Sequence, residues 1–126
     1  MFKYAAVGTA GALGASARYI ITVMVPAESG FPLATLLVNL IGAFLLTFTG
    51  FYLFQRIKIS DTLKTAVSVG FLGSFTTFSA LSLETVSLLE NGRLFTAAAY
   101  VLLSISGGVL MSYAGYLCHR LPGRRT

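Results

Sequence analysis

GFLGSFTTFS, from Gly70 to Ser79, interrupts an otherwise apolar part of the chain. Its two glycines lie three residues apart and lower helix propensity. The hydroxyls of Ser74, Thr76 and Thr77 can hydrogen-bond to nearby backbone groups and so compete with helical bonding. We therefore predict a membrane-spanning helix that is broken at this stretch, near the midplane of the bilayer.

The rest of the composition is that of a membrane protein. The chain has 126 residues, of which 56% are hydrophobic and 10% are charged, whereas a soluble domain carries about 25% charged residues. A helix of about 20 apolar residues crosses the hydrocarbon core, and barrel strands are about half as long. We predict an all-α fold in which residues 1–126 form a single domain with four transmembrane helices, at about residues 4–25, 33–54, 62–89 and 94–117. Ser60 or Asp61 is expected to cap the third helix.

The basic residues predict the orientation of the helices. Seven of them belong to the N-terminus, the turn between the second and third helices, and the C-terminus: Lys3, Arg56, Lys58, Lys64, Arg120, Arg124 and Arg125. Only Arg93 lies on the other side, with Arg18 inside the span. Because basic residues concentrate in cytoplasmic segments, we predict a multi-pass plasma-membrane protein with both termini in the cytoplasm. The same scattering of charge argues against a nucleic-acid-binding stripe.

Three polar side chains lie within the predicted spans. Arg18 lies 14 residues after Tyr4, about 21 Å along a helix, so it either lines a wet vestibule near a pore mouth or extends to the interface. Asn39 must find partners in hydrocarbon, either through a bond between helices or by facing an ion. Glu84 lies two helical turns after Thr77 and either reaches the interface or lines a wet cavity.

The last span carries a polar stripe. Residues with small or hydroxylated side chains recur every four positions, at Tyr100, Ser104, Gly108, Ser112 and Tyr116, and therefore lie on one helix face. Serine and glycine in membrane helices often serve only to pack helices together. The stripe indicates a function only in combination with Asn39 and the broken third helix.

These features suit passive anion binding better than catalysis. Freed N–H groups, hydroxyls, amides and the positive edges of phenylalanine rings can face an anion, and freed carbonyls can bind a cation. The only histidine, His119, and the only cysteine, Cys118, lie together near the C-terminus, and no carboxylate pair at catalytic spacing is present. An enzyme is not expected. Two alternatives are a small four-helix proton-coupled multidrug exporter, which needs an acid where the first helix has Arg18, and a partner subunit that does not conduct.

Three motifs that follow one another along the chain resemble the motifs of a known family. GALGASARY at Gly11–Tyr19, VNLIG at Val38–Gly42 and GFLGSFTTFS at Gly70–Ser79 make the chain similar to the CrcB or Fluc family of fluoride channels. The resemblance covers nearly the whole chain. It implies a passive, fluoride-selective channel that exports cytoplasmic fluoride, built as an antiparallel dimer in the lipid bilayer with a structural sodium ion at its centre.

The resemblance also implies roles for individual residues. The backbone carbonyls of Gly73 and Thr76 would bind the sodium ion, and Arg18 would lie at the vestibule. The pore would be lined by residues of the last three helices: Phe78, Asn39, Thr77, Ser79, Glu84, Tyr100, Ser104 and Ser112. All of these assignments are expectations carried over from matching motif positions.

The chain departs from the family pattern in three ways. Leu81 occupies the position of a second pore phenylalanine, and Gly108 lacks the hydroxyl of the polar track. The charge bias is the third departure, because a chain that pairs with itself in antiparallel fashion must insert in both orientations. We therefore expect an antiparallel dimer with a homologous second subunit of opposite bias, and one altered or lost pore.

Overall fold

A computed structural model of the chain describes residues 1–26 and 30–120 and contains four helical segments in that part of the chain. Arg124 and Arg125, which count toward the predicted orientation, lie outside the described residues. The first segment is α1 (Phe2–Met24). The second runs without interruption through α2 (Leu33–Phe48), the π-helical turn η1 (Thr49–Leu53) and α3 (Phe54–Arg56). Both lie within two residues of the predicted ranges 4–25 and 33–54.

The third segment is the least regular. It begins with α4 (Asp61–Thr65), continues through the π-helical η2 (Ala66–Leu72) and α5 (Gly73–Phe75), and resumes as α6 (Phe78–Glu90). The Ser60 side chain accepts a hydrogen bond from the Leu63 N–H, 3.2 Å away, which confirms Ser60 as the N-cap. Between α5 and α6, Thr76 and Thr77 have extended backbone angles.

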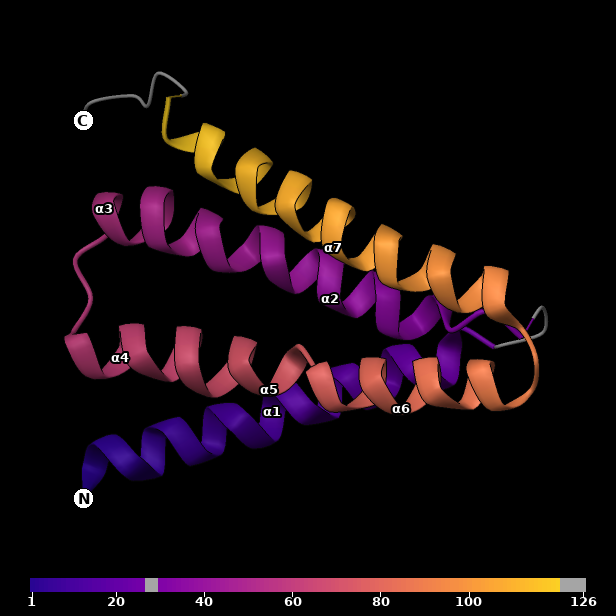
Figure 1. Ribbon diagram of the computed structural model, residues 1–126. Coiled ribbons are helices and arrows are strands. Elements are labelled where there is room, and N and C mark those ends of the chain that lie inside the picture. The colour runs from indigo at the N-terminus through magenta and orange to yellow at the C-terminus, as the bar shows by residue number, and fades with distance from the viewer. Residues whose placement is uncertain (27–29, 121–126) are drawn as a thin grey trace.

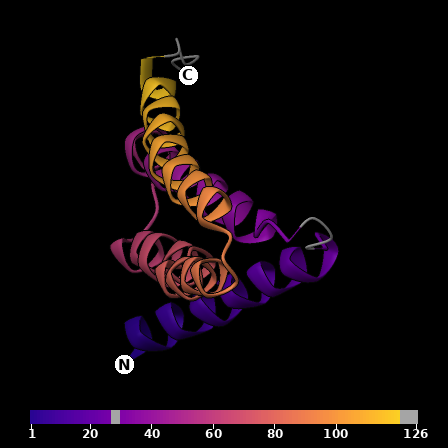
Figure 2. The same cartoon turned by 45° about the vertical axis from the view of Figure 1, so that its right-hand side comes forward.

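The fourth segment is α7 (Leu94–Leu117), which has the predicted bounds and is followed by the short 3₁₀ turn η3 (Cys118–Arg120). The four segments form two layers, because α7 lies along α2 and α1 lies against η2 and α5 (Figures 1 and 2). The start of α1, the connection from α3 to α4 and the end of α7 share one end of the molecule (Figure 1).

Glycine residues allow the helical segments within each layer to pack closely against each other. A Cβ atom on Gly14 of α1 would overlap the carbonyl oxygen of Phe71, and one on Gly70 would lie 2.6 Å from the carbonyl oxygen of Val7. On the other layer, a Cβ atom on Gly115 would lie 2.5 Å from the carbonyl oxygen of Phe44. Backbone approach of this kind is what small residues permit between membrane helices.

Replacing Gly14 by alanine should therefore destabilise the first layer. The new methyl group meets rigid backbone at Phe71, so α1 must move away, at a cost of about 1–3 kcal/mol. Gly8→Ala is the matched control, since no atom lies within 4 Å of its Cβ position. Thermal unfolding in detergent should rank Gly14→Ala well below the unchanged chain and Gly8→Ala close to it. Equal unfolding temperatures for the two variants would contradict this packing.

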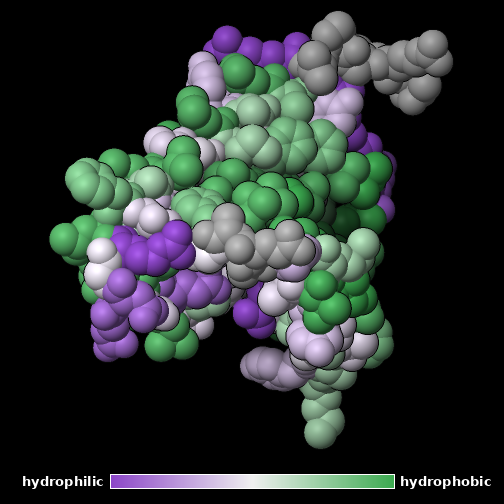
Figure 3. Space-filling view, turned by 90° about the vertical axis from the view of Figure 1, so that its right-hand side faces the viewer, coloured by the Kyte–Doolittle hydropathy of each residue, from purple (hydrophilic) through white to green (hydrophobic). Residues whose placement is uncertain are grey.

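The surface of the described chain is strongly apolar. Large hydrophobic side chains face outward on every segment, and Phe95 on α7 is 94% exposed. Hydrophobic residues also cover much of the face seen from the end where α6 joins α7 (Figure 3). Three segments are long and apolar enough to cross a membrane: Leu33–Arg56, Asp61–Glu90 and Leu94–Arg120. The 23-residue α1 is long enough, but its glycines and Arg18 make it less apolar.

Candidate functional site

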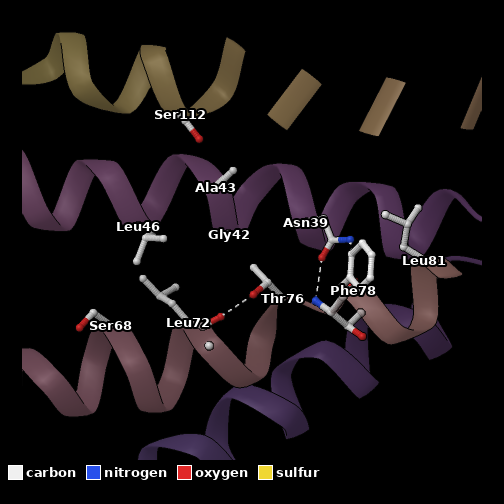
Figure 4. Close-up of a pocket in the computed structure, with 12 residues that line it drawn as sticks. Asn39, Gly42, Ala43, Leu46, Ser68, Leu72, Thr76, Phe78, Leu81 and Ser112 are labelled. Carbon is white, nitrogen blue, oxygen red and sulfur yellow. Dashed lines mark hydrogen bonds between the residues drawn. The ribbon is translucent and has the colours of Figure 1, made fainter. Parts of the chain in front are cut away.

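The extended residues between α5 and α6 are held by Asn39 of α2. Asn39 Nδ2 donates to the Thr77 carbonyl oxygen at 3.0 Å, and Asn39 Oδ1 accepts from the Thr77 N–H at 2.8 Å. The amide thus satisfies both backbone groups of one residue, as Figure 4 shows for the bond to the N–H. Of the two alternatives for Asn39, the structure shows the bond between helical segments.

In this arrangement bonds to side chains replace two helical hydrogen bonds. In a continuous helix the Thr77 N–H would donate to the Gly73 carbonyl and the Ala80 N–H to the Thr76 carbonyl. Here the Thr77 N–H donates to Asn39, and the Ala80 N–H donates to Thr77 Oγ1 at 3.1 Å. Thr77 is therefore the N-cap of α6, and the carbonyls of Gly73 and Thr76 lose their usual partners.

A cavity of about 390 Å³ opens beside these carbonyls. Its lining combines the extended residues with α2, η2, α6 and α7 (Figure 4): Asn39, Gly42, Ala43, Leu46, Ser68, Leu72, Gly73, Thr76, Thr77, Phe78, Leu81 and Ser112. Phe78 is 80% exposed, so its ring forms part of an open face. Leu81 lies one helical turn after Phe78 and lines the same cavity.

Glu84 is the centre of a second polar group. Its Oε1 accepts from Thr35 Oγ1 at 2.7 Å, and its Oε2 accepts from the Tyr100 hydroxyl at 2.9 Å. Tyr100 is completely buried and meets the Phe31 ring edge-on, with 5.6 Å between ring centroids. Both carboxylate oxygens of Glu84 are thus occupied by hydroxyl donors from α2 and α7.

Glu84 also lines two further cavities. One of about 270 Å³ is shared with Arg18, Thr22, Thr35 and Thr77. The other, of about 340 Å³, is lined by Thr22, Thr35 and Glu84 together with residues near Pro26 and Pro32. Of the two alternatives for Glu84, the structure shows a cavity-lining position.

Arg18 faces the cavity that also contains Glu84. Its Nε atom is buried and has no hydrogen-bond partner among the described residues. A buried guanidinium nitrogen without a partner is costly unless water or an anion completes it. Arg18 therefore lies beside a cavity that it shares with Glu84.

The three cavities follow one another through shared residues. Thr77 lines both the cavity beside the extended residues and the cavity of Arg18. Thr35 and Glu84 line the cavity of Arg18 and the one near Pro32. The three cavities are therefore neighbours, and the last of them lies at the end of the molecule where α1 and α2 are joined.

The remaining predicted site residues have other surroundings. Ser79 is exposed, with its Oγ 3.3 Å from Thr77 Oγ1. Ser104 donates to the Tyr100 carbonyl of its own helix at 2.7 Å. Sequence reasoning missed Thr35, although a hydroxyl one helical turn before Asn39 on an apolar helix was a usable signal. The bond from Thr35 to Glu84 joins residues 49 positions apart and has no local pattern.

Comparison with known proteins identifies the family. The family model described as CrcB-like protein, Camphor Resistance (CrcB) matches residues 5–116. A relative from Desulfitobacterium hafniense, named fluoride-specific ion channel FluC 1, is 50% identical over 103 residues, covering 82% of this chain and 90% of its own length.

Two further relatives are named fluoride-specific ion channel FluC 2. The relative from Geobacillus kaustophilus is 50% identical over 115 residues, covering 90% of this chain and 89% of its own length. The relative from Listeria monocytogenes serovar 1/2a is 44% identical over 119 residues, covering 94% and 92%. Together with its three apolar segments, these matches make the chain a multi-pass membrane protein, and it belongs to the CrcB family.

Proposed function

We propose that this chain is a subunit of a passive fluoride-selective channel that exports fluoride from the cytoplasm. The main supporting observation is the row of three neighbouring cavities, which share Thr77, Thr35 and Glu84 as lining residues. The names of the relatives support fluoride as the ion and a channel in preference to a multidrug exporter or an enzyme. Phenyl edges and hydroxyls along such a path offer a small anion several weak sites, as conduction requires.

The extended pair Thr76–Thr77 is proposed to be a helix break at the bilayer midplane. Irregular backbone at membrane depth persists only where protein buries it or where it lines a cavity. Here Asn39 pairs with Thr77, and both threonines line the 390 Å³ cavity. Because this cavity is open and Phe78 faces outward, we propose that a second subunit, running antiparallel, completes it.

A structural sodium ion fits the residues at this break. Unwound backbone carbonyls are the sodium ligands that discontinuous membrane helices provide. The carbonyls of Gly73 and Thr76 have lost their helical partners, and both residues line the cavity. These two residues would hold the ion, whose charge would favour close approach of the two subunits and neutralise the carbonyl dipoles.

The second subunit is proposed to be a different, homologous chain. Seven basic residues against one favour insertion in a single orientation, with both termini in the cytoplasm. An antiparallel partner must then carry the opposite bias. Leu81 lines the main cavity where the family pattern has a ring, so we propose that one of the two pores is altered or lost.

A flux assay tests this function. Liposomes containing this chain alone, or this chain with a homologous chain of inverted charge bias, are loaded with fluoride or chloride, and ion efflux is followed with ion-selective electrodes. We expect fluoride efflux only with both chains and no chloride efflux. Full efflux from this chain alone would contradict obligate pairing, and equal efflux of both ions would contradict fluoride selectivity.

Replacing Phe78 by isoleucine should lower fluoride efflux without unfolding the protein. The ring is 80% exposed and lines the main cavity, so little packing is lost, but the positive ring edge that can face an anion disappears. Phe95→Ile on α7 is the matched control, because Phe95 is also strongly exposed, at 94%. Efflux is measured for both variants in the assembly that conducts. Unchanged efflux with Phe78→Ile would remove Phe78 from the pore.

A further inference from the structure

An apolar groove lies on the outside of the first layer, away from the proposed pore. The N-terminal half of α1, from Phe2 to Leu13, forms one wall, and Leu63, Val67 and Phe71 form the other. Figures 1 and 2 show these segments side by side. The groove has a volume of about 490 Å³, within the range of pockets that hold small molecules.

The groove offers an occupant no free polar group along its walls. Thr9 carries the only hydroxyl among the residues that line it, and its Oγ1 already donates to the Ala5 carbonyl at 2.8 Å. From Phe2 to Leu13 the wall is about 16 Å long at the rise of an α-helix. That length equals about half of the hydrocarbon core, which is the depth of one leaflet.

The charged residues lie at one end of this groove. Lys3 follows Phe2, and Lys64 follows Leu63. Neither lysine lines the groove itself, but both lie in the first turns of α1 and α4, at the level of its end. Asp61, in the first turn of α4, is the acidic residue of this end among the described residues. Basic residues next to a membrane span attract anionic headgroups.

We propose that this groove binds one anionic phospholipid. The acyl chain would lie along α1 as far as Leu13, and the phosphate would lie near Lys3 and Lys64. A second protein chain fits less well, because its apolar contact would not match a groove that is one leaflet long and basic at a single end. The site is separate from the 390 Å³ cavity and is independent of which ion the protein conducts.

Native mass spectrometry of the full chain tests this site. The purified protein is mixed with phosphatidylglycerol or phosphatidylcholine of identical acyl chains, and bound lipid is counted. We expect phosphatidylglycerol to be preferred. Lys3→Gln with Lys64→Gln should cut that preference by about thirtyfold. The control pair Lys58→Gln with Arg120→Gln removes the same charge at the same end of the molecule, from exposed residues that do not adjoin a groove residue in sequence, and should leave the preference unchanged.

A second pair of variants tests the groove itself. Ala5 is exposed and lines the groove, so the ring of Ala5→Phe fills the groove without disturbing the packing of α1. Ala98→Phe is the control, because it adds the same ring to an exposed site on α7. Ala5→Phe should abolish the retained lipid and Ala98→Phe should not. The proposal would be overturned if the two lipids bound equally, or if variants and controls lost lipid to the same extent. It would also be overturned if lipid were found on monomers but never on dimers. The last result would assign the groove to a second copy.

Discussion

Alanine in place of Asn39 should release the extended residues between α5 and α6 and abolish fluoride efflux. The Thr77 N–H and carbonyl would lose the side-chain partner that lies 2.8 and 3.0 Å away. Hydrogen bonds between membrane helices contribute roughly 0.6–1.7 kcal/mol each, so the loss is about 1–3 kcal/mol. The freed Thr77 N–H can then return to the Gly73 carbonyl, which would extend α5 toward α6 and close the cavity.

Two measurements check this prediction. Thermal unfolding in detergent reports the lost stability, and liposome efflux reports the lost path. Asn91→Ala is the matched control, because Asn91 Nδ2 makes one exposed bond, to the Ser87 carbonyl at 2.9 Å, that water can replace. Normal efflux with Asn39→Ala would show that the path does not depend on Thr77 being held by Asn39.

Asn39→Asp separates hydrogen bonding from the volume of the side chain. The carboxylate still accepts from the Thr77 N–H, but it cannot donate to the Thr77 carbonyl. One of its oxygens instead lies against the Thr77 carbonyl oxygen. Efflux should fall as in Asn39→Ala, although the side chain keeps its volume. If Asn39→Asp conducts normally, the bond to the carbonyl is not required.

The helices could be predicted from the sequence because their signals are local. The apolar run and the polar residues around it place α7 at Leu94–Leu117, as predicted, and Ser60 is recognisable as a cap from its residue type and position. The glycines and hydroxyls of GFLGSFTTFS are likewise a local signal for the extended backbone at Thr76 and Thr77. Each of these features depends on residues a few positions apart.

The partners at the candidate site could not be predicted, because they are distant in sequence. Asn39 and Thr77 are 38 positions apart, and Thr35 and Glu84 are 49 apart. The sequence shows that an amide in hydrocarbon needs partners, but only the packing of α2 against the third segment decides which. The π-helical turns η1 and η2 were also missed, since spans that are apolar nearly all round have no clear helical period for an extra residue to shift.

Leucine in place of Glu84 should cause a large loss of stability through Tyr100. The Tyr100 hydroxyl donates to Glu84 Oε2 and the side chain is completely buried. In Glu84→Leu the hydroxyls of Tyr100 and Thr35 both lose the carboxylate that accepts from them. Losing an acceptor that serves two buried or half-buried hydroxyls costs about 2–4 kcal/mol. Glu90→Leu, at an exposed position in the last turn of the same helix, is the matched control and should change the unfolding temperature little.

The double variant Glu84→Leu with Tyr100→Phe decides whether this mechanism is correct. Tyr100→Phe alone removes a good hydrogen bond, but in the Glu84→Leu background it removes a buried hydroxyl that has lost its carboxylate acceptor. The second change should therefore raise the unfolding temperature of Glu84→Leu, although it lowers that of the unchanged chain. A change of sign of this kind is the signature of direct coupling in a double-mutant cycle. Additive losses would show that Glu84 does not stabilise the fold through the hydroxyl of Tyr100.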